Sequence, residues 1–282
     1  MSKPVYITAD STCDLPQELK ERLGVKIVPL HVTIGQDNYL DGEDISPDLI
    51  FERYNQEKLL PTTAAVSPQE FEDFFRPLVE EGYEVVHFDI SSELSGTYQN
   101  AVIAAQELEG GYPIDSRHLS TSISLLVMEA CRLRDQGKSA PEIVQAVQAL
   151  IPQVRTSFVL DTLEYMWKGG RCSGVAAFGA NLLSLKPCIA MEDGKLDVSK
   201  KYRGKIGKVY EKYIEERLAD KKIYGGSVFV VGPDVLPQET CDKLEALIRS
   251  LVTVEEVFFA RTGSTVCAHC GPGTLGVMYI EA

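Results

Sequence analysis

The first half of the chain alternates short apolar strands with amphipathic helices, and this alternation limits the possible folds more than any other feature. Strands are predicted at residues 5–9, 25–34, 84–90 and 114–119. Helices are predicted at residues 17–23, 44–55, 70–81, 97–108, 124–136 and 141–154. Because a strand that returns through a helix re-enters the sheet in the same direction, crossovers of this length join parallel strands. The sequence therefore predicts an α/β fold with an N-terminal, doubly wound, mainly parallel sheet.

The pattern changes near Arg155, beyond which strands and helices no longer alternate regularly. Strands are predicted at residues 158–160, 188–191, 196–200, 227–231, 257–260 and 276–280. Helices are predicted at residues 163–167, 175–183, 205–218 and 238–251. Glu192-Asp193-Gly194 is typical of a hairpin turn. We expect an N-terminal α/β domain over residues 1–155 and a C-terminal mixed α+β domain over residues 156–282.

Charge and hydrophobic content narrow the class of protein. The chain has 282 residues, 44% of them hydrophobic, which is enough for two packed cores. A net charge of −13 disfavours nucleic acid, and with it a DNA-binding regulator, as well as anionic lipid surfaces. No apolar run is long enough to insert stably in a membrane, and Met1 leads almost directly into a strand without a signal peptide. We expect a cytoplasmic protein.

The seven cysteines favour reduced thiols over disulfides. Cys267 and Cys270 form an isolated CxxC pair, and His269 beside them does not complete a tetrahedral zinc site. Because this segment reads as a loop before the last strand, it also differs from a thioredoxin-like helix start. We expect two ordinary cysteines and no metal.

Three loops of the first half carry hydroxyl groups: residues 10–14, 62–67 and 91–97. Each by itself is explained by a capping turn, but ligands collect where parallel strands end, so three together favour a site. In the last loop Gly96 allows close backbone approach, while Ser92, Ser95 and Thr97 offer uncharged donors at a helix N-terminus. These features predict a site for a small anion.

A second reading of the same loop is a serine nucleophile. Ser95 could act with His269 in a hydrolase for lipid esters, although the Gly-x-Ser-x-Gly elbow is missing and no acid is evident to orient the histidine. Gly271, Gly273 and Gly276 crowd the segment after His269, and a structural and a functional role for this histidine are equally compatible with that pattern. Phosphate-cradling and dinucleotide-binding glycine motifs are absent from the sequence.

Seven segments, in order along almost the whole chain, resemble the DegV family of bacterial fatty-acid-binding proteins, which serve as the acyl-binding subunit of fatty acid kinase. The segments are residues 7–15, 61–68, 91–99, 169–171, 182–187, 203–204 and 269–277. Each motif is short, but the ordered set is specific.

The resemblance implies two α/β domains that enclose a long acyl chain, with the ligand site at their junction. It implies that Thr63 and Ser95 hydrogen-bond the fatty-acid carboxylate and that His269 supports them. Loop residues that support the site would be Thr62, Gly96, Thr97, Gly271 and Gly273. Arg171 and Arg203 would dock the partner, an ATP-dependent fatty acid kinase that makes the acyl phosphate. The chain itself would be a carrier without catalytic residues, metal or cofactor.

The chain departs from the family pattern at two places. Ala64 and Ala65 stand where the family usually has Ser and Gln, and Ser120-Thr-Ser-Ile-Ser124 replaces a glycine-bearing segment. These changes leave the length and saturation of the preferred fatty acid open.

Overall fold

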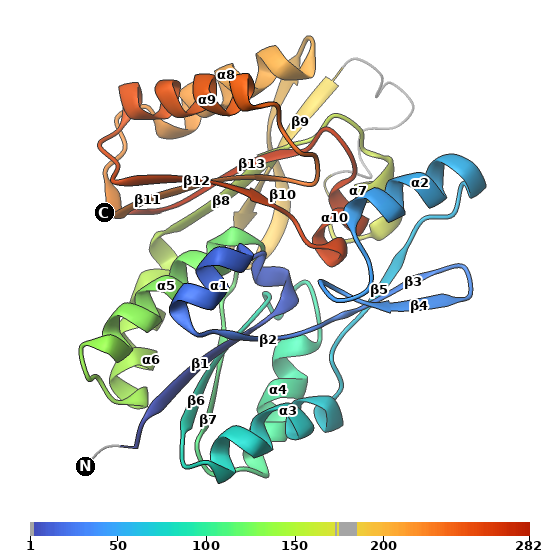
Figure 1. Ribbon diagram of the computed structural model, residues 1–282. Helices are drawn as coiled ribbons and strands as arrows, with labels where there is room; N and C mark the ends of the chain where they lie inside the picture. Colours follow the sequence, from blue (N-terminus) through green and yellow to red (C-terminus); the bar gives the residue numbers. More distant parts are fainter. Residues whose placement is uncertain (1–2, 173, 175–184) are drawn as a thin grey trace.

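The computed structural model describes residues 3–172, 174 and 185–282 (Figure 1). Its N-terminal sheet has the order β2-β1-β6-β7, and all neighbouring strands are parallel. The strands are β1 (Val5–Asp10), β2 (Lys26–Val28), β6 (Glu84–Asp89) and β7 (Gly111–Asp115). The predicted parallel sheet is confirmed.

Helices cover both faces of this sheet (Figure 1). On one face lie α1 (Gln17–Leu23), α5 (Thr121–Asp135) and α6 (Ala140–Leu150), and on the other α3 (Pro68–Glu80) and α4 (Thr97–Gln106). Successive side chains of β6 point to opposite faces, so Val86 joins the core under α5 and Val85 joins the core under α3. Burial on both faces explains why successive positions such as Val85 and Val86 are both apolar.

The second sheet is mixed and has the order β10-β9-β8-β13-β11-β12. Its strands are β8 (Val154–Val159), β9 (Leu185–Glu192), β10 (Lys195–Arg203), β11 (Ile223–Gly232), β12 (Glu256–Arg261) and β13 (Leu275–Glu281). β11 and β12 are parallel, and the other pairs, including the predicted β9–β10 hairpin, are antiparallel. The mixed C-terminal sheet is confirmed.

The two sheets share one hydrophobic core. Helices α8 (Ile206–Leu218) and α9 (Gln238–Leu251) cover the outer face of the second sheet, whereas α5 contacts strands of both sheets from between them (Figure 1). Phe88 of β6, Leu126 of α5 and Phe229 of β11 accordingly belong to a single cluster of buried side chains. The space between the sheets is therefore part of the protein interior.

Two sequence predictions in the first half are wrong. Residues 25–34 form two strands, because Pro29 has no N–H group for a ladder and separates β2 from β3 (His31–Ile34). β3 leaves the parallel sheet and pairs antiparallel with β4 (Asp37–Leu40) and β5 (Thr62–Ala64). The segment predicted as a loop at residues 62–67 thus contains a strand, which is too short to show a period-two pattern.

Two helix starts carry clear local capping signals. Ser46 caps α2 (Pro47–Glu57), and Ser67 caps α3 in a capping box with Glu70. α3 and α5 begin two and three residues earlier than predicted. The helix predicted at residues 175–183 lies outside the described residues.

The prediction of a loop before the last strand is wrong in part. Residues Ser264–Cys270 form α10, which packs against α7 (Glu164–Gly169), α2 and the three-stranded sheet. Gly263 precedes α10 without a side-chain cap, so sequence offers no start signal for this helix. Its start is instead stabilised by residues far away in the chain, as described below.

Candidate ligand-binding site

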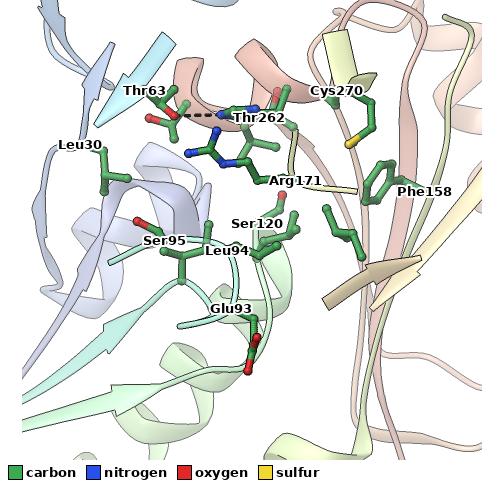
Figure 2. Close-up of a pocket in the computed structure, with 18 of the residues that line it drawn as sticks. Leu30, Thr63, Glu93, Leu94, Ser95, Ser120, Phe158, Arg171, Thr262 and Cys270 are labelled. Carbon is green, nitrogen blue, oxygen red and sulfur yellow. Dashed lines mark hydrogen bonds between the residues drawn. The ribbon is translucent and has the colours of Figure 1, made fainter. Parts of the chain in front are cut away.

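A cavity of about 470 Å³ lies between the two sheets, near the carboxyl end of β6. This volume is in the usual range for small-molecule sites. Apolar side chains from both halves line much of it: Leu30, Ile90, Leu119, Phe158, Met166, Leu196, Val231, Val266 and Met278. Ser95, Thr63, His269 and Arg171 also line it, so the structure brings together distant residues singled out by the sequence (Figure 2).

The Ser95 loop lies directly after β6. The backbone N–H of Ile90, at the start of this loop, donates to the buried Asp10 carboxylate over 2.8 Å. Ser95 Oγ lies 2.8 Å from Thr97 Oγ1 and accepts the Thr97 N–H over 3.2 Å, at the first turn of α4. Ser95 is only partly buried, which leaves its hydroxyl at the cavity wall. The predicted combination of a strand end, hydroxyls and a helix start is confirmed.

Thr63 and His269 form a hydrogen bond across 206 positions of sequence. Thr63 Oγ1 on β5 lies 2.9 Å from His269 Nε2 on α10 (Figure 2). Burial lowers the pKa of His269 to about 4, and the positive charge of Arg171 adds to the effect. The imidazole is therefore neutral near pH 7.

The other ring nitrogen decides the direction of this bond. His269 Nδ1 is buried and has no hydrogen-bond partner among the described residues. A Cβ on Gly169 would lie 2.3 Å from this nitrogen, so glycine is required at 169 for the ring to fit. A buried lone pair costs less than a buried orphan N–H, and we therefore assign the proton to Nε2. Thr63 then accepts from His269 and keeps its own O–H free for a ligand anion.

Two buried carboxylates hold the start of α10. The N–H of Gly263 donates to Asp14 Oδ1 and that of Ser264 to Asp41 Oδ1, each over 2.6 Å. Burial raises the pKa of both carboxyl groups, while the bonds to these amides oppose the shift. Asp14 belongs to the first of the three hydroxyl-bearing loops, whereas no local sequence pattern distinguishes Asp41. Through α10, both residues determine where His269 lies.

Arg171 lies at the mouth of the cavity. Its side chain is exposed, its Nη1 donates to the Gly169 carbonyl over 2.7 Å, and it faces the same space as Thr63 (Figure 2). The site thus contains a cation, whereas the sequence predicts uncharged donors there. Arg203, at the end of β10, is exposed and is not among the described residues that line the cavity.

Only some of the predicted supporting residues lie at the cavity. Gly96 lines the cavity, and Thr97 is buried behind it. Thr62 points to solvent beside Thr63. Gly271 and Gly273 adopt φ angles of 72° and 68°, and they turn the chain between α10 and β13 without lining the described part of the cavity.

The geometry does not favour a serine hydrolase. In the described structure Ser95 bonds to Thr97, and His269 Nε2 bonds to Thr63. A serine hydrolase needs a nucleophile that is hydrogen-bonded to its base. It also needs an acid that is hydrogen-bonded to the second nitrogen of that base. His269 Nδ1 has no such acid within the part of the chain that the structure describes.

The described residues contain no group of three or more His, Cys, Asp or Glu side chains that could hold a metal ion. None of their helices has the length and apolar character needed to cross a bilayer.

Comparison with known proteins agrees with these features. The model of a family described as uncharacterised proteins of the DegV family matches residues 4–282. A DegV domain-containing protein of Clostridium acetobutylicum is 33% identical over 282 residues, which cover 98% of each chain. A Thermus thermophilus structure, described as fatty-acid binding by a DegV family protein, has 32% identity, a TM-score of 0.87 and full coverage of both chains. A stearic-acid-binding protein from Eubacterium ventriosum has 28% identity and a TM-score of 0.82 over 98% of each chain.

Proposed function

Because the chain belongs to the DegV family, we propose that it binds a long-chain fatty acid in the cavity between its two sheets. The observation that carries the proposal is the composition of that cavity. Thr63, Ser95, His269 and Arg171 supply polar groups, and a wall of aliphatic and aromatic side chains supplies an apolar surface. An amphiphile with one anionic end matches this arrangement.

Burial of the tail supplies most of the affinity. Each buried methylene contributes roughly 0.8 kcal/mol, so a chain of about 16 carbons gains on the order of 12 kcal/mol before ordering costs. The carboxylate then fixes the orientation. Thr63 and Ser95 donate hydroxyl protons to it, and the Arg171 charge attracts it to the mouth. An ester of the same acid lacks the negative charge and would bind more weakly.

We further propose that the protein acts as a carrier that presents the carboxylate to an ATP-dependent kinase, which forms the acyl phosphate. The hydroxyl donors support this role because they hold the anion without the tight bidentate clamp that would blunt its nucleophilicity. Arg203 is exposed and does not line the described cavity, which is what we expect of a residue that docks a partner. Arg171 lies where it can contact both the ligand and a partner.

Native mass spectrometry of the freshly purified protein tests the binding proposal. We expect an added mass that denaturing extraction identifies as a fatty acid, and uptake of added palmitate or oleate by protein from which lipid was removed. Methyl palmitate, which has the same tail and no charge, is the matched control ligand. Lipid-free preparations that also fail to take up either acid would overturn the proposal.

The two arginines can be separated by experiment. We expect Arg203→Ala to leave fatty-acid affinity unchanged and to impair phosphorylation by the kinase. Arg171→Ala should impair phosphorylation as well and weaken binding only a few-fold, because its charge at the exposed mouth is screened by solvent. Fluorescent-ligand displacement and a phosphorylation assay measure the two effects. Loss of affinity in Arg203→Ala would contradict the docking role.

A further inference from the structure

The apolar end of the cavity lies on the inner face of the second sheet. Phe158 of β8 and Gly276 of β13 are directly opposite each other in the strand ladder, and both line the cavity. Met278, two residues after Gly276, is on the same face of β13 and also lines it. Figure 2 shows Phe158 on the side of the cavity away from Thr63 and Ser95.

The end of the Met278 side chain occupies the space that a side chain on residue 276 would need. A Cβ built on Gly276 would lie 2.8 Å from Met278 Cε and 3.1 Å from its Sδ, so the thioether lies over the glycine. Gly276 does not have the positive φ that favours glycine, unlike Gly271 and Gly273. The backbone conformation therefore allows a side chain at 276, and the space is limited mainly by Met278 and in addition by the Ser157 carbonyl. Met278 itself is 1% exposed.

We propose that Gly276 and Met278 determine the length of the acyl chain that the cavity accepts. The proposal rests on the proposed function, because it assumes that a fatty-acid tail points toward the second sheet. Methionine is unbranched and flexible, and here its terminal atoms lie folded over the glycine. The tail meets this side chain at the apolar end, so the space above Gly276 sets how many methylenes are buried.

Two substitutions should change chain-length preference in opposite directions. Met278→Ala removes three heavy atoms, which leaves room for roughly two more methylenes, and each buried methylene is worth about a fourfold gain in affinity. Gly276→Ala pushes the thioether out of its position and into the cavity, which favours a chain shorter by about one or two carbons. The Ser157 carbonyl, 3.1 Å from the new Cβ, has to shift slightly.

The experiment offers the full-length protein an equimolar mixture of saturated straight-chain acids from lauric to arachidic acid and reads the bound distribution by native mass spectrometry. Met191→Ala is the matched control for the methionine, since Met191 packs on the same core without being in the described cavity lining. Gly207→Ala on α8 is the control for the glycine, because a Cβ there meets nothing within 4 Å. Both controls should keep the wild-type distribution.

A shift to longer acids in Met278→Ala and to shorter acids in Gly276→Ala supports the proposal. If Gly276→Ala does not fold, Met278→Ala decides alone. An unchanged distribution in Met278→Ala, with fatty acid still bound, overturns the proposal but leaves the proposed function intact. Wild-type protein that binds none of the acids overturns the proposed function, and this proposal with it.

Discussion

At the scale of single residues, the proposed carboxylate site depends on the proton between Thr63 and His269. The imidazole is neutral, and its Nδ1 is buried against Gly169. Its Nε2–H donates to Thr63 Oγ1. This arrangement orients the threonine hydroxyl as a donor toward the cavity. His269 thus acts through Thr63, and the pair should respond to substitution as a unit.

Thr63→Val tests this unit because it replaces the hydroxyl by a methyl group of similar size. His269 Nε2–H then has no acceptor, which should lower the free energy of unfolding by about 1–3 kcal/mol and reduce fatty-acid affinity at least tenfold. Urea unfolding and ligand displacement measure the two effects. Thr63→Ser should retain both properties, and Thr62→Val, on the same strand but facing solvent, should change neither. Equal effects of the two valine substitutions would show that the hydroxyl of Thr63 is unimportant.

The low pKa of His269 predicts how stability depends on pH. The unfolded chain protonates this histidine near its ordinary pKa of 6.5, whereas the folded chain does so near 4. Its contribution to stability is therefore complete above pH 6.5 and is lost as pH falls toward 4, by at most about 1.4 kcal/mol per pH unit. The difference in unfolding free energy between wild type and His269→Gln should shrink between pH 7 and pH 5.

Urea titration of both proteins gives a difference in unfolding free energy in which the contributions of other titrating groups cancel. His118, whose pKa burial also lowers to about 4, is present in both and cancels. So does Asp10, whose pKa burial raises to about 7 and which destabilises the fold as pH rises. A difference that stays constant with pH would mean that His269 is protonated equally in both states.

At the scale of elements, α10 joins the two halves of the site. It carries His269, yet its first N–H groups donate to Asp14 and Asp41, which belong to the first 41 residues. A Cβ on Gly263 would come within 3.1 Å of both carboxylates, so any larger residue at this position would push them away by a few tenths of an ångström. The helix is short, and its position depends on these tertiary contacts more than on its own sequence.

Asp41→Ala should loosen this helix. The substitution leaves the Ser264 N–H and the Ser11 hydroxyl without an acceptor, which should cost roughly 2–4 kcal/mol of stability. Hydrogen exchange should accelerate in residues 264–270 and fatty-acid binding should weaken, because His269 is no longer held in place. Glu43→Ala, at an exposed site nearby, is the control. Unchanged exchange in α10 would contradict the role of Asp41.

At the scale of the whole molecule, the candidate site is the cavity between the two sheets, both of which contact α5. A second contact between the halves involves the β9–β10 turn, where Ser91 Oγ donates to the Gly194 carbonyl over 2.7 Å and Arg117 donates to the Asp193 carbonyl. This turn therefore rests on the loop that carries Ser95. Both halves must be in place for the cavity to exist.

The shared core predicts one cooperative unfolding transition. Although the strand pattern predicts a boundary at residue 155, α5 buries side chains against both sheets, so we expect neither half to keep its core without the other. Calorimetric and van't Hoff enthalpies of unfolding should agree. Two separate heat-absorption peaks would show that residues 1–155 and 156–282 fold independently.

The sequence by itself determined the elements whose signals are local. Strand–helix alternation predicts the parallel sheet, Ser46 and Ser67 mark two helix starts, and Glu192-Asp193-Gly194 marks the β9–β10 turn. These features follow from side-chain periodicity and from capping, which act over a few residues. The Ser95 loop was recognisable for the same reason.

The tertiary structure alone decided how distant residues meet. β5 exists because it pairs with β3, and α10 begins where Asp14 and Asp41 accept its amides. Thr63 and His269 meet only through these two elements, and no local pattern encodes a contact across 206 positions. Pairing of this kind depends on the packing of the whole chain, because each contact is stable only when the rest of the core has formed.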